Sequence, residues 1–141
     1  MKKSRPLIGI IAAEAEYVFF SNALNTIQKE LFAANMDAAV FSSLMMSGNA
    51  EFDAAENSVY DLVDFDLLDG IIIFPSSIND VTSRERLIAR IKSDFKGPVV
   101  SFDSQVDGFA NCIYNYEPAA DMMVSHIMDH HGCKAVSYTH L

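Results

Sequence analysis

The segment DGIIIFP, residues 69–75, decides the fold of this chain. An apolar run rich in isoleucine follows a turn at Asp69-Gly70 and stops at Pro75, which has no N–H group for a sheet hydrogen bond. A continuous apolar run of this kind is typical of a strand that is buried on both faces of a parallel sheet. We therefore predict a strand from Gly70 to Phe74.

Similar apolar runs recur along the chain and alternate with segments of helical period. The further predicted strands are Leu7 to Ala12, Ala38 to Ser42, Val99 to Phe102 and a short Asn111 to Tyr114. Connections between parallel strands are almost always right-handed, which leaves a doubly wound sheet as the simplest arrangement of these strands and helices. We expect an α/β fold with a doubly wound parallel sheet of about five strands, in the order 2-1-3-4-5.

Four helices are predicted, each with apolar residues at helical spacing. The first runs from about Val18 to Asn35, the second spans residues 52–62, the third starts at a Thr82–Glu85 capping box, and the fourth runs from about Pro118 to a stop at Gly132. The residues expected to face the core are, in chain order, Phe20, Leu24, Ile27, Leu31, Phe52, Ala55, Val59, Leu62, Leu87, Ile88, Ile91, Phe95, Ala120, Met123, Val124 and Ile127.

The composition suits one globular domain, since 50% of the 141 residues are hydrophobic. The formal net charge of −9 opposes direct contact with nucleic-acid phosphates, which relies on clustered Lys and Arg. The apolar run after the basic start at residues 1–5 is too short to span a membrane, and acidic residues stand where a signal-peptide cleavage site would fall. We therefore expect a cytoplasmic protein without a membrane partner. Cys112 and Cys133 lack the spacing of a zinc site or a disulfide framework.

The candidate binding residues come from loops after the strands, because ligands of open parallel sheets bind outside the strands' carboxyl ends. These residues are Phe19, Phe20, Ser76, Asp103 and Asn115. Hydroxyls, a carboxylate and aromatic rings suit a small polar ligand such as a sugar, held by hydrogen bonds and ring stacking. Of Phe19 and Phe20, one must pack inward and only the other can line a cleft. The alternative for Ser76 and Asp103 is that they only cap turns.

The sequence carries no recognised catalytic motif. Ile11 to Glu14 stands where a glycine-rich phosphate loop would follow the first strand, and there is no GxSxG nucleophile elbow. We interpret the four aspartates within residues 61–69 as solvated side chains. His126 and His130 lie near the predicted C-terminal end of the fourth helix, where the helix dipole favours histidine. We expect a non-enzymatic chain with no catalytic residue, no metal and no cofactor.

Several short motifs, in order and spacing, resemble the N-terminal lobe of periplasmic-binding-protein-like sensor domains of the LacI/GalR type. Ile8 to Ile11 followed by Tyr17 to Phe20 looks like the family's "IGIIVP…NPFF" opening, and residues 69–75 look like its "DGIII..P" strand. Pro98 to Asp103 is similar to its "PVV.ID", and Asn115 to Gly132 to the helix before its second lobe. The resemblance covers about residues 6 to 135.

This resemblance implies a small-molecule sensor lobe of a bacterial signalling or transcriptional regulator, which acts by hinge closure around a ligand. It implies that residues 6–132 form the N-terminal ligand-binding lobe and that residues 133–141 are a truncated start of the crossover to a second lobe. A homodimer of the full-length parent is also implied. The sequences from Phe102 to Ser104 and from His130 to Cys133 look most like those of the sensory halves of certain GGDEF diguanylate cyclases.

Three positions depart from the family pattern. Val18 stands where the family often has Pro, Tyr114 where it has Asp, and Ser104 where it commonly has Arg, so the ligand need not be a typical sugar.

Two alternative functions stay open. The first is a solute-binding receptor of a membrane transporter, which a leader or lipobox cysteine would support. The second is a flavodoxin-like or receiver-like domain, and its receiver version requires an Asp at the end of the strand that here closes with Phe74-Pro75.

Overall fold

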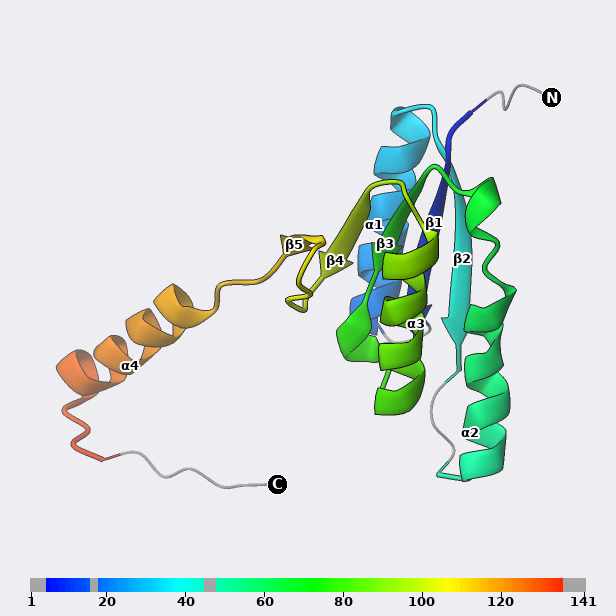
Figure 1. The fold of residues 1–141 in the computed structure, drawn as a ribbon. Coiled ribbons are helices and arrows are strands. Elements are labelled where there is room, and N and C mark those ends of the chain that lie inside the picture. Colours follow the sequence, from blue (N-terminus) through cyan, green and yellow to red (C-terminus); the bar gives the residue numbers. More distant parts are fainter. Residues whose placement is uncertain (1–4, 16–17, 45–47, 136–141) are drawn as a thin grey trace.

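The computed structural model describes residues 5–15, 18–44 and 48–135 (Figure 1). The basic residues 1–4, Tyr17 and the tail at 136–141, on which some of the expectations above fall, lie outside these ranges. The strands are β1 (Leu7–Ala13), β2 (Asp37–Ser43), β3 (Gly70–Ile73), β4 (Val99–Phe102) and β5 (Ala110–Cys112). The α-helices are α1 (Val18–Ala33), α2 (Ala50–Asn57), α3 (Val81–Asp94) and α4 (Glu117–His131), and short 3₁₀ helices occupy Ser58–Leu62, Phe65–Leu67 and Pro75–Ser77.

The strands form one sheet in the order β2-β1-β3-β4-β5, and every neighbouring pair is parallel. In the centre of the sheet, Ile10 of β1 lies between Val40 of β2 and Ile72 of β3. The predicted α/β fold, the parallel sheet and the strand order 2-1-3-4-5 are confirmed. The isoleucine run of β3 lies in the middle of this sheet, where both faces are covered.

Alternate residues of β1 belong to two separate cores, because successive side chains of a strand point to opposite faces of the sheet. Ile10 and Ala12 pack on the α1 face together with Phe74. Ile11 and Ala13 pack on the opposite face, whose core α3 completes. Figure 1 shows α1 behind the sheet and α3 in front of it. The predicted inward stripe of α1 is confirmed in the first of these cores by Phe20, Leu24, Ile27 and Leu31.

The inward stripe predicted for the second helix is wrong for Phe52, Ala55 and Leu62, whereas Val59 packs against the core of the α3 face. Phe52 is half exposed and Leu62 is 74% exposed. The buried residues of this segment are instead Asp53, Asn57 and Tyr60. Within α2, the inward face carries Asp53 and Asn57 instead of Phe52, and after Asn57 a 3₁₀ helix continues the chain to Leu62. A turn of three residues instead of 3.6 rotates Leu62 away from the face expected of a continuous α-helix.

The capping box predicted for α3 is also wrong. The helix starts earlier than expected, and its N-cap is Asp80, whose carboxylate accepts a hydrogen bond of 2.7 Å from the backbone N–H of Ser83. Thr82 therefore lies inside the first turn. Hydrogen bonds to Ser83 lower the pKa of Asp80, which keeps the cap ionised. The inward residues predicted for α3 are confirmed, with Ile88 only partly buried.

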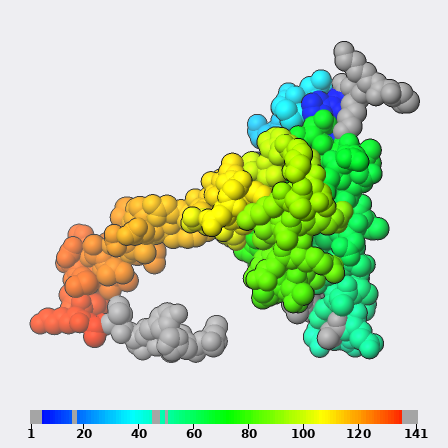
Figure 2. Space-filling view, in the orientation of Figure 1, coloured from blue at the N-terminus to red at the C-terminus, as the bar shows by residue number. Residues whose placement is uncertain are grey.

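Helix α4 ends as predicted at Gly132, which adopts a left-handed conformation with φ of 62°. Its predicted core-facing side is wrong, because Ala120, Met123, Val124 and Ile127 are all exposed. Figures 1 and 2 show α4 projecting from the β5 edge, well away from the sheet. An apolar stripe thus identified the helix correctly but did not identify what it packs against.

Candidate functional site

The carboxyl ends of the parallel strands meet at one edge of the sheet, and the candidate site is built there. Glu14 follows β1, Ser43 ends β2, the 3₁₀ helix Pro75–Ser77 follows β3, and Asp103 follows β4. Glu14 and Asp103 adopt positive φ values of 54° and 61°, a region that non-glycine residues seldom occupy. The chain therefore turns sharply at two of these strand ends, which is common where backbone geometry serves a site.

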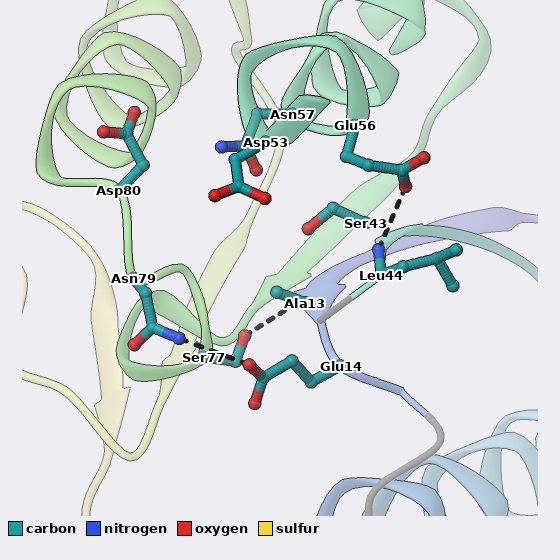
Figure 3. A pocket seen from close by; sticks show the side chains of 10 residues that line it. All are labelled: Ala13, Glu14, Ser43, Leu44, Asp53, Glu56, Asn57, Ser77, Asn79 and Asp80. Carbon is teal, nitrogen blue, oxygen red and sulfur yellow. Dashed lines mark hydrogen bonds between the residues drawn. The ribbon is translucent and has the colours of Figure 1, made fainter. Parts of the chain in front are cut away.

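A small polar pocket lies at this edge between β1, β2, α2 and the start of α3 (Figure 3). Its room for a guest is about 10 Å³, close to that of one water molecule. Four of its lining residues are carboxylic acids and none is Lys, Arg or His. The residues that line it are Ala13, Glu14, Ser43, Leu44, Asp53, Glu56, Asn57, Ser77, Asn79 and Asp80.

Buried hydroxyls fix the floor of this polar pocket. Ser77 Oγ accepts a hydrogen bond of 2.8 Å from the N–H of Ala13 and donates one of 2.7 Å to the carbonyl of Phe74. Tyr60 donates its hydroxyl proton to the carbonyl of Ala12 at 2.9 Å, so Ser43 Oγ, 2.8 Å away, is the donor to Tyr60 Oη. Burial raises the pKa of the Tyr60 phenol. The ends of β1, β2 and β3 are thus tied together by side chains.

Two acidic side chains of the polar pocket, Glu14 and Glu56, are held more loosely, by long hydrogen bonds. Asn79 Nδ2 donates to Glu14 Oε1 at 3.3 Å, and the N–H of Leu44 donates to Glu56 Oε2 at 3.2 Å. Asn57 is only 7% exposed, and its carboxamide is not among the buried polar groups that lack a hydrogen-bond partner in the described part of the chain. Figure 3 shows Asp53 and Asn57 side by side on α2, facing Ser77 and Asn79.

Two of the residues predicted from sequence, Ser76 and Asp103, are brought together. Ser76 Oγ donates a long hydrogen bond of 3.4 Å to Asp103 Oδ2. The backbone N–H of Asp103 donates to the carbonyl of Cys112 at 2.8 Å, which anchors this residue to the end of β5. Ser76 is exposed and Asp103 is half-buried, so both offer polar atoms to solvent at the edge.

The two predicted phenylalanines divide as expected, one inward and one outward. Phe20 packs on the buried Phe74 with ring centroids 6.0 Å apart. Phe19 is half exposed and meets Tyr114 at 6.2 Å, and Tyr114 meets Phe102 at 5.6 Å. Phe19, Phe102 and Tyr114 line a groove of about 340 Å³ along α1. Phe19, rather than Phe20, therefore supplies an accessible aromatic surface.

Asn115 stands apart from the other predicted site residues. It is exposed in the segment between β5 and α4, where its Oδ1 accepts a hydrogen bond of 3.1 Å from the N–H of Glu117. Within the described ranges, no hydrogen bond or ring contact joins it to the other four. Its observed role is to cap the first turn of α4.

Metal-ligating side chains do not gather into a site in the described part of the chain, where no group of three or more His, Cys, Asp or Glu residues is placed to hold an ion. His126 and His131 lie with their Nε2 atoms 3.3 Å apart on the exposed α4. Among the described residues, no helix is long and apolar enough to cross a membrane.

Sequence reasoning missed most of the polar pocket. Asp53, Glu56 and Asn57 occupy positions i, i+3 and i+4 of α2, and that spacing places three polar side chains on one helix face. This polar spacing was visible in the sequence. Apolar Phe52, Ala55 and Val59 also have helical spacing, however, and they predicted that another face of the helix is buried.

No family model and no curated protein matches this chain. Its fold is similar to that of the Lac repressor, in a crystal structure of the repressor dimer bound to operator and the anti-inducer ONPF. The TM-score is 0.66 at 16% sequence identity, and the match covers 91% of this chain and 42% of the repressor chain. The chain therefore has a Lac repressor-like fold and spans less than half of the repressor's length.

Proposed function

We propose that this chain is the small-molecule-binding lobe of a regulator that closes with a second lobe around its ligand. The observation that carries the proposal is the edge itself, where Ser76 and Asp103 meet at 3.4 Å with their polar atoms open to solvent. The fold supports it further, because the Lac repressor structure with a similar fold holds both an operator and a small anti-inducer. Open parallel sheets bind ligands at this same edge.

The proposed mechanism is a shift of population. Ligand contacts that exist only when the two lobes close would favour the closed form, and an attached output would respond to that closure. Ser76 and Asp103 supply hydrogen bonds, and Phe19 supplies a stacking surface. In this proposal the chain itself performs no catalysis and requires neither cofactor nor metal.

The wider arrangement is also part of the proposal. Residues 6–132 form the binding lobe, the segment from 133 leads to the second lobe, and the parent is a cytoplasmic homodimer. In this proposal the chain has no membrane partner, and it makes no direct contact with nucleic acid because it carries a formal net charge of −9. The output is a transcription regulator or a diguanylate cyclase.

Calorimetric titration of a chain extended to include the second lobe, against sugars, nucleosides and amino acids, tests the proposal. We expect saturable binding without turnover of the solute. Asp103→Asn removes the carboxylate charge and keeps a residue type that tolerates positive φ, so it should weaken binding about tenfold. Asp107→Asn, in the same loop, changes the net charge equally and serves as the control.

Two outcomes would contradict the proposal. Turnover of any of these solutes would show an enzyme. Equal losses of affinity in Asp103→Asn and Asp107→Asn would show that the edge residue makes no specific contact. Ser76→Ala should fall between these variants, because it removes one neutral hydrogen-bonding group.

A further inference from the structure

We propose that this chain forms a dimer by exchange of α4, so that α4 of each copy packs along α1 of the other copy. The docking surface is the groove of about 340 Å³ beside Phe19 and Tyr114, called here the α1 groove, and its occupant is α4 of a second copy. This inference concerns assembly and does not depend on the identity of any ligand.

Helix α4 presents an apolar face to solvent. Every residue of α4 is exposed, and Figure 2 shows the helix projecting from the rest of the chain. Its apolar face consists of Ala120, Met123, Val124, Ile127 and Met128, at positions i, i+3, i+4, i+7 and i+8. A helix of 15 residues is marginally stable in water by itself, because most helical stability in proteins comes from the packing of an apolar face. Helix α4 therefore requires a surface to pack on.

The α1 groove offers a matching surface. Its α1 side is formed by Phe19, Asn22, Ala23, Thr26 and Ile27, which follow the same spacing of i, i+3, i+4, i+7 and i+8. On each helix these five positions span a little over two turns, about 12 Å. None of the described lining residues of the groove carries a charge, and the apolar face of α4 carries none either. Depletion of charge is typical of the core of a protein interface.

The segment between β5 and α4 favours a second copy over the chain's own helix. Tyr114 packs on Phe19 and Phe102, with ring centroids 6.2 and 5.6 Å away, which holds the start of the segment at the groove. Tyr116 then stacks on Tyr114, with centroids 5.6 Å apart and the rings inclined by 31°. The chain's own α4 could enter the groove only if this segment reversed direction and lost the stacking. The α4 of a second copy enters with the segment unchanged.

Reciprocal exchange also covers more surface than direct pairing of two α4 helices. Pairing of α4 with α4 would bury both helices but would leave the α1 groove of each copy open. Exchange fills both grooves and buries both helices in one closed, two-fold arrangement. Large exposed apolar surfaces are uncommon in monomers, so the arrangement that covers all of them is favoured.

Light scattering of the 141-residue chain tests the assembly. We expect a mass of twice 15.6 kDa at the concentrations used for NMR. Val124→Asp places a charge on the apolar face of α4 and should weaken dimerisation at least tenfold. Ser125→Asp adds the same residue at the next position, outside that face, and should leave dimerisation unaltered. A monomeric wild-type chain, or equal effects of the two variants, would overturn the proposal.

A second pair of variants tests the groove. Thr26→Asp lies in the α1 groove and should weaken dimerisation at least tenfold, whereas Asn25→Asp, exposed on another face of α1, should not. A dimer that survives Thr26→Asp but is lost in Val124→Asp would show pairing of α4 with α4 and would overturn the exchange.

Thermal melts in dilute solution separate packing between copies from packing within one chain. Below the dissociation concentration of the dimer, Val124→Asp and Ser125→Asp should melt at the same temperature, because α4 of the single chain is exposed. A lower melting temperature for Val124→Asp alone would show that α4 packs on its own chain, and the exchange would be wrong.

A spin label detects the exchange directly. Cys133 follows the end of α4 and is exposed, and Cys112→Ser leaves it as the single attachment site. In a mixture of spin-labelled copies and ¹⁵N-labelled copies without the spin label, we expect broadening of the amide signals of Ala23 to Ile27. Broadening of these signals only when both labels are on the same copy would overturn the proposal.

Discussion

The centre of the sheet and its β4–β5 margin differ in how completely they are covered. On the α3 face, Leu87, Ile91 and Phe95 close a core with the residues of β1 and β3, but toward the margin Ile91 and Phe95 border an open groove of about 410 Å³. On the other face, α1 covers the centre, but Phe102 and Tyr114 border an open groove of about 340 Å³. Helix α4, which follows that open margin in the chain, lies away from it (Figure 1). The stability of this chain therefore resides mainly in the two cores at the centre of the sheet, and the β4–β5 margin adds little.

A matched pair of isoleucine truncations gives the largest expected difference between the two regions. Ile91 on the α3 face is 1% exposed, and Ile91→Ala should lower the free energy of unfolding by about 2–5 kcal/mol through lost burial and a cavity. Ile113, beyond β5, is 52% exposed, and Ile113→Ala should cost less than about 0.5 kcal/mol. Urea denaturation measures both, and equal costs would show that the margin is packed in solution.

The phenol of Tyr60 should give the next largest effect. Tyr60→Phe removes the hydrogen bonds to Ala12 and Ser43 and should lower the free energy of unfolding by about 1–3 kcal/mol near neutral pH. Ser58→Ala, on the exposed side of the same segment, is the control.

The same variant has a pH signature. Because burial raises the pKa of Tyr60 in the folded chain above its ordinary 10.0, the contribution of its proton to stability is complete below that pH. It is lost as the pH rises through the folded-state pKa. The gap in unfolding free energy between wild type and Tyr60→Phe should therefore stay constant up to about pH 9 and shrink as the pH rises above 10.0. A gap that stays constant above that pH would contradict the burial of the phenol.

A smaller effect is expected at the start of α3. Asp80→Ala removes the N-cap and should cost about 1 kcal/mol, whereas Thr82→Ala, inside the first turn, should cost less than about 0.5 kcal/mol. Thermal melts of the two variants compare them directly. A larger stability loss in Thr82→Ala than in Asp80→Ala would support the capping box that the sequence predicts.

The smallest effect is expected on α4. Met123 is exposed, so Met123→Ser should change the free energy of unfolding by less than about 0.5 kcal/mol, whereas Leu24→Ala on α1 should cost about 2–5 kcal/mol. A clear loss of stability in Met123→Ser would show that α4 docks on an apolar surface, and it would reduce the contrast between the two regions.

The sheet was well predicted because each strand can be recognised from a short stretch of sequence. An uninterrupted apolar run such as Ile71 to Phe74 fits a strand covered on both faces, and four such runs leave few topologies. The stripe of α1 was equally clear. Helix α2 was harder, because Phe52 and Leu62 fit a helical period, but Phe52 lies on the outward face of α2 and the 3₁₀ continuation turns Leu62 outward.

The site was only partly predictable for a related reason. Ser76, Asp103 and Phe19 follow strand ends, so the rule for parallel sheets brings them to the edge without further information. The polar pocket depends instead on polar residues of a helix, Asp53 and Asn57, that face inward. Patterns that assume apolar residues inside do not identify such residues. The position of α4 depends on contacts between distant parts of the chain, which no local pattern reports.

The left-handed backbone at Glu14 and Asp103 has a consequence for directed evolution. Glycine adopts these φ values of 54° and 61° without steric cost, so a library selected only for heat resistance is expected to enrich glycine at both positions. Each such replacement would remove a negative charge from the edge and gain thermal tolerance at the expense of recognition. Deep sequencing of survivors checks this, and glutamate and aspartate retained under heat selection alone would show that the two side chains already contribute to holding the fold.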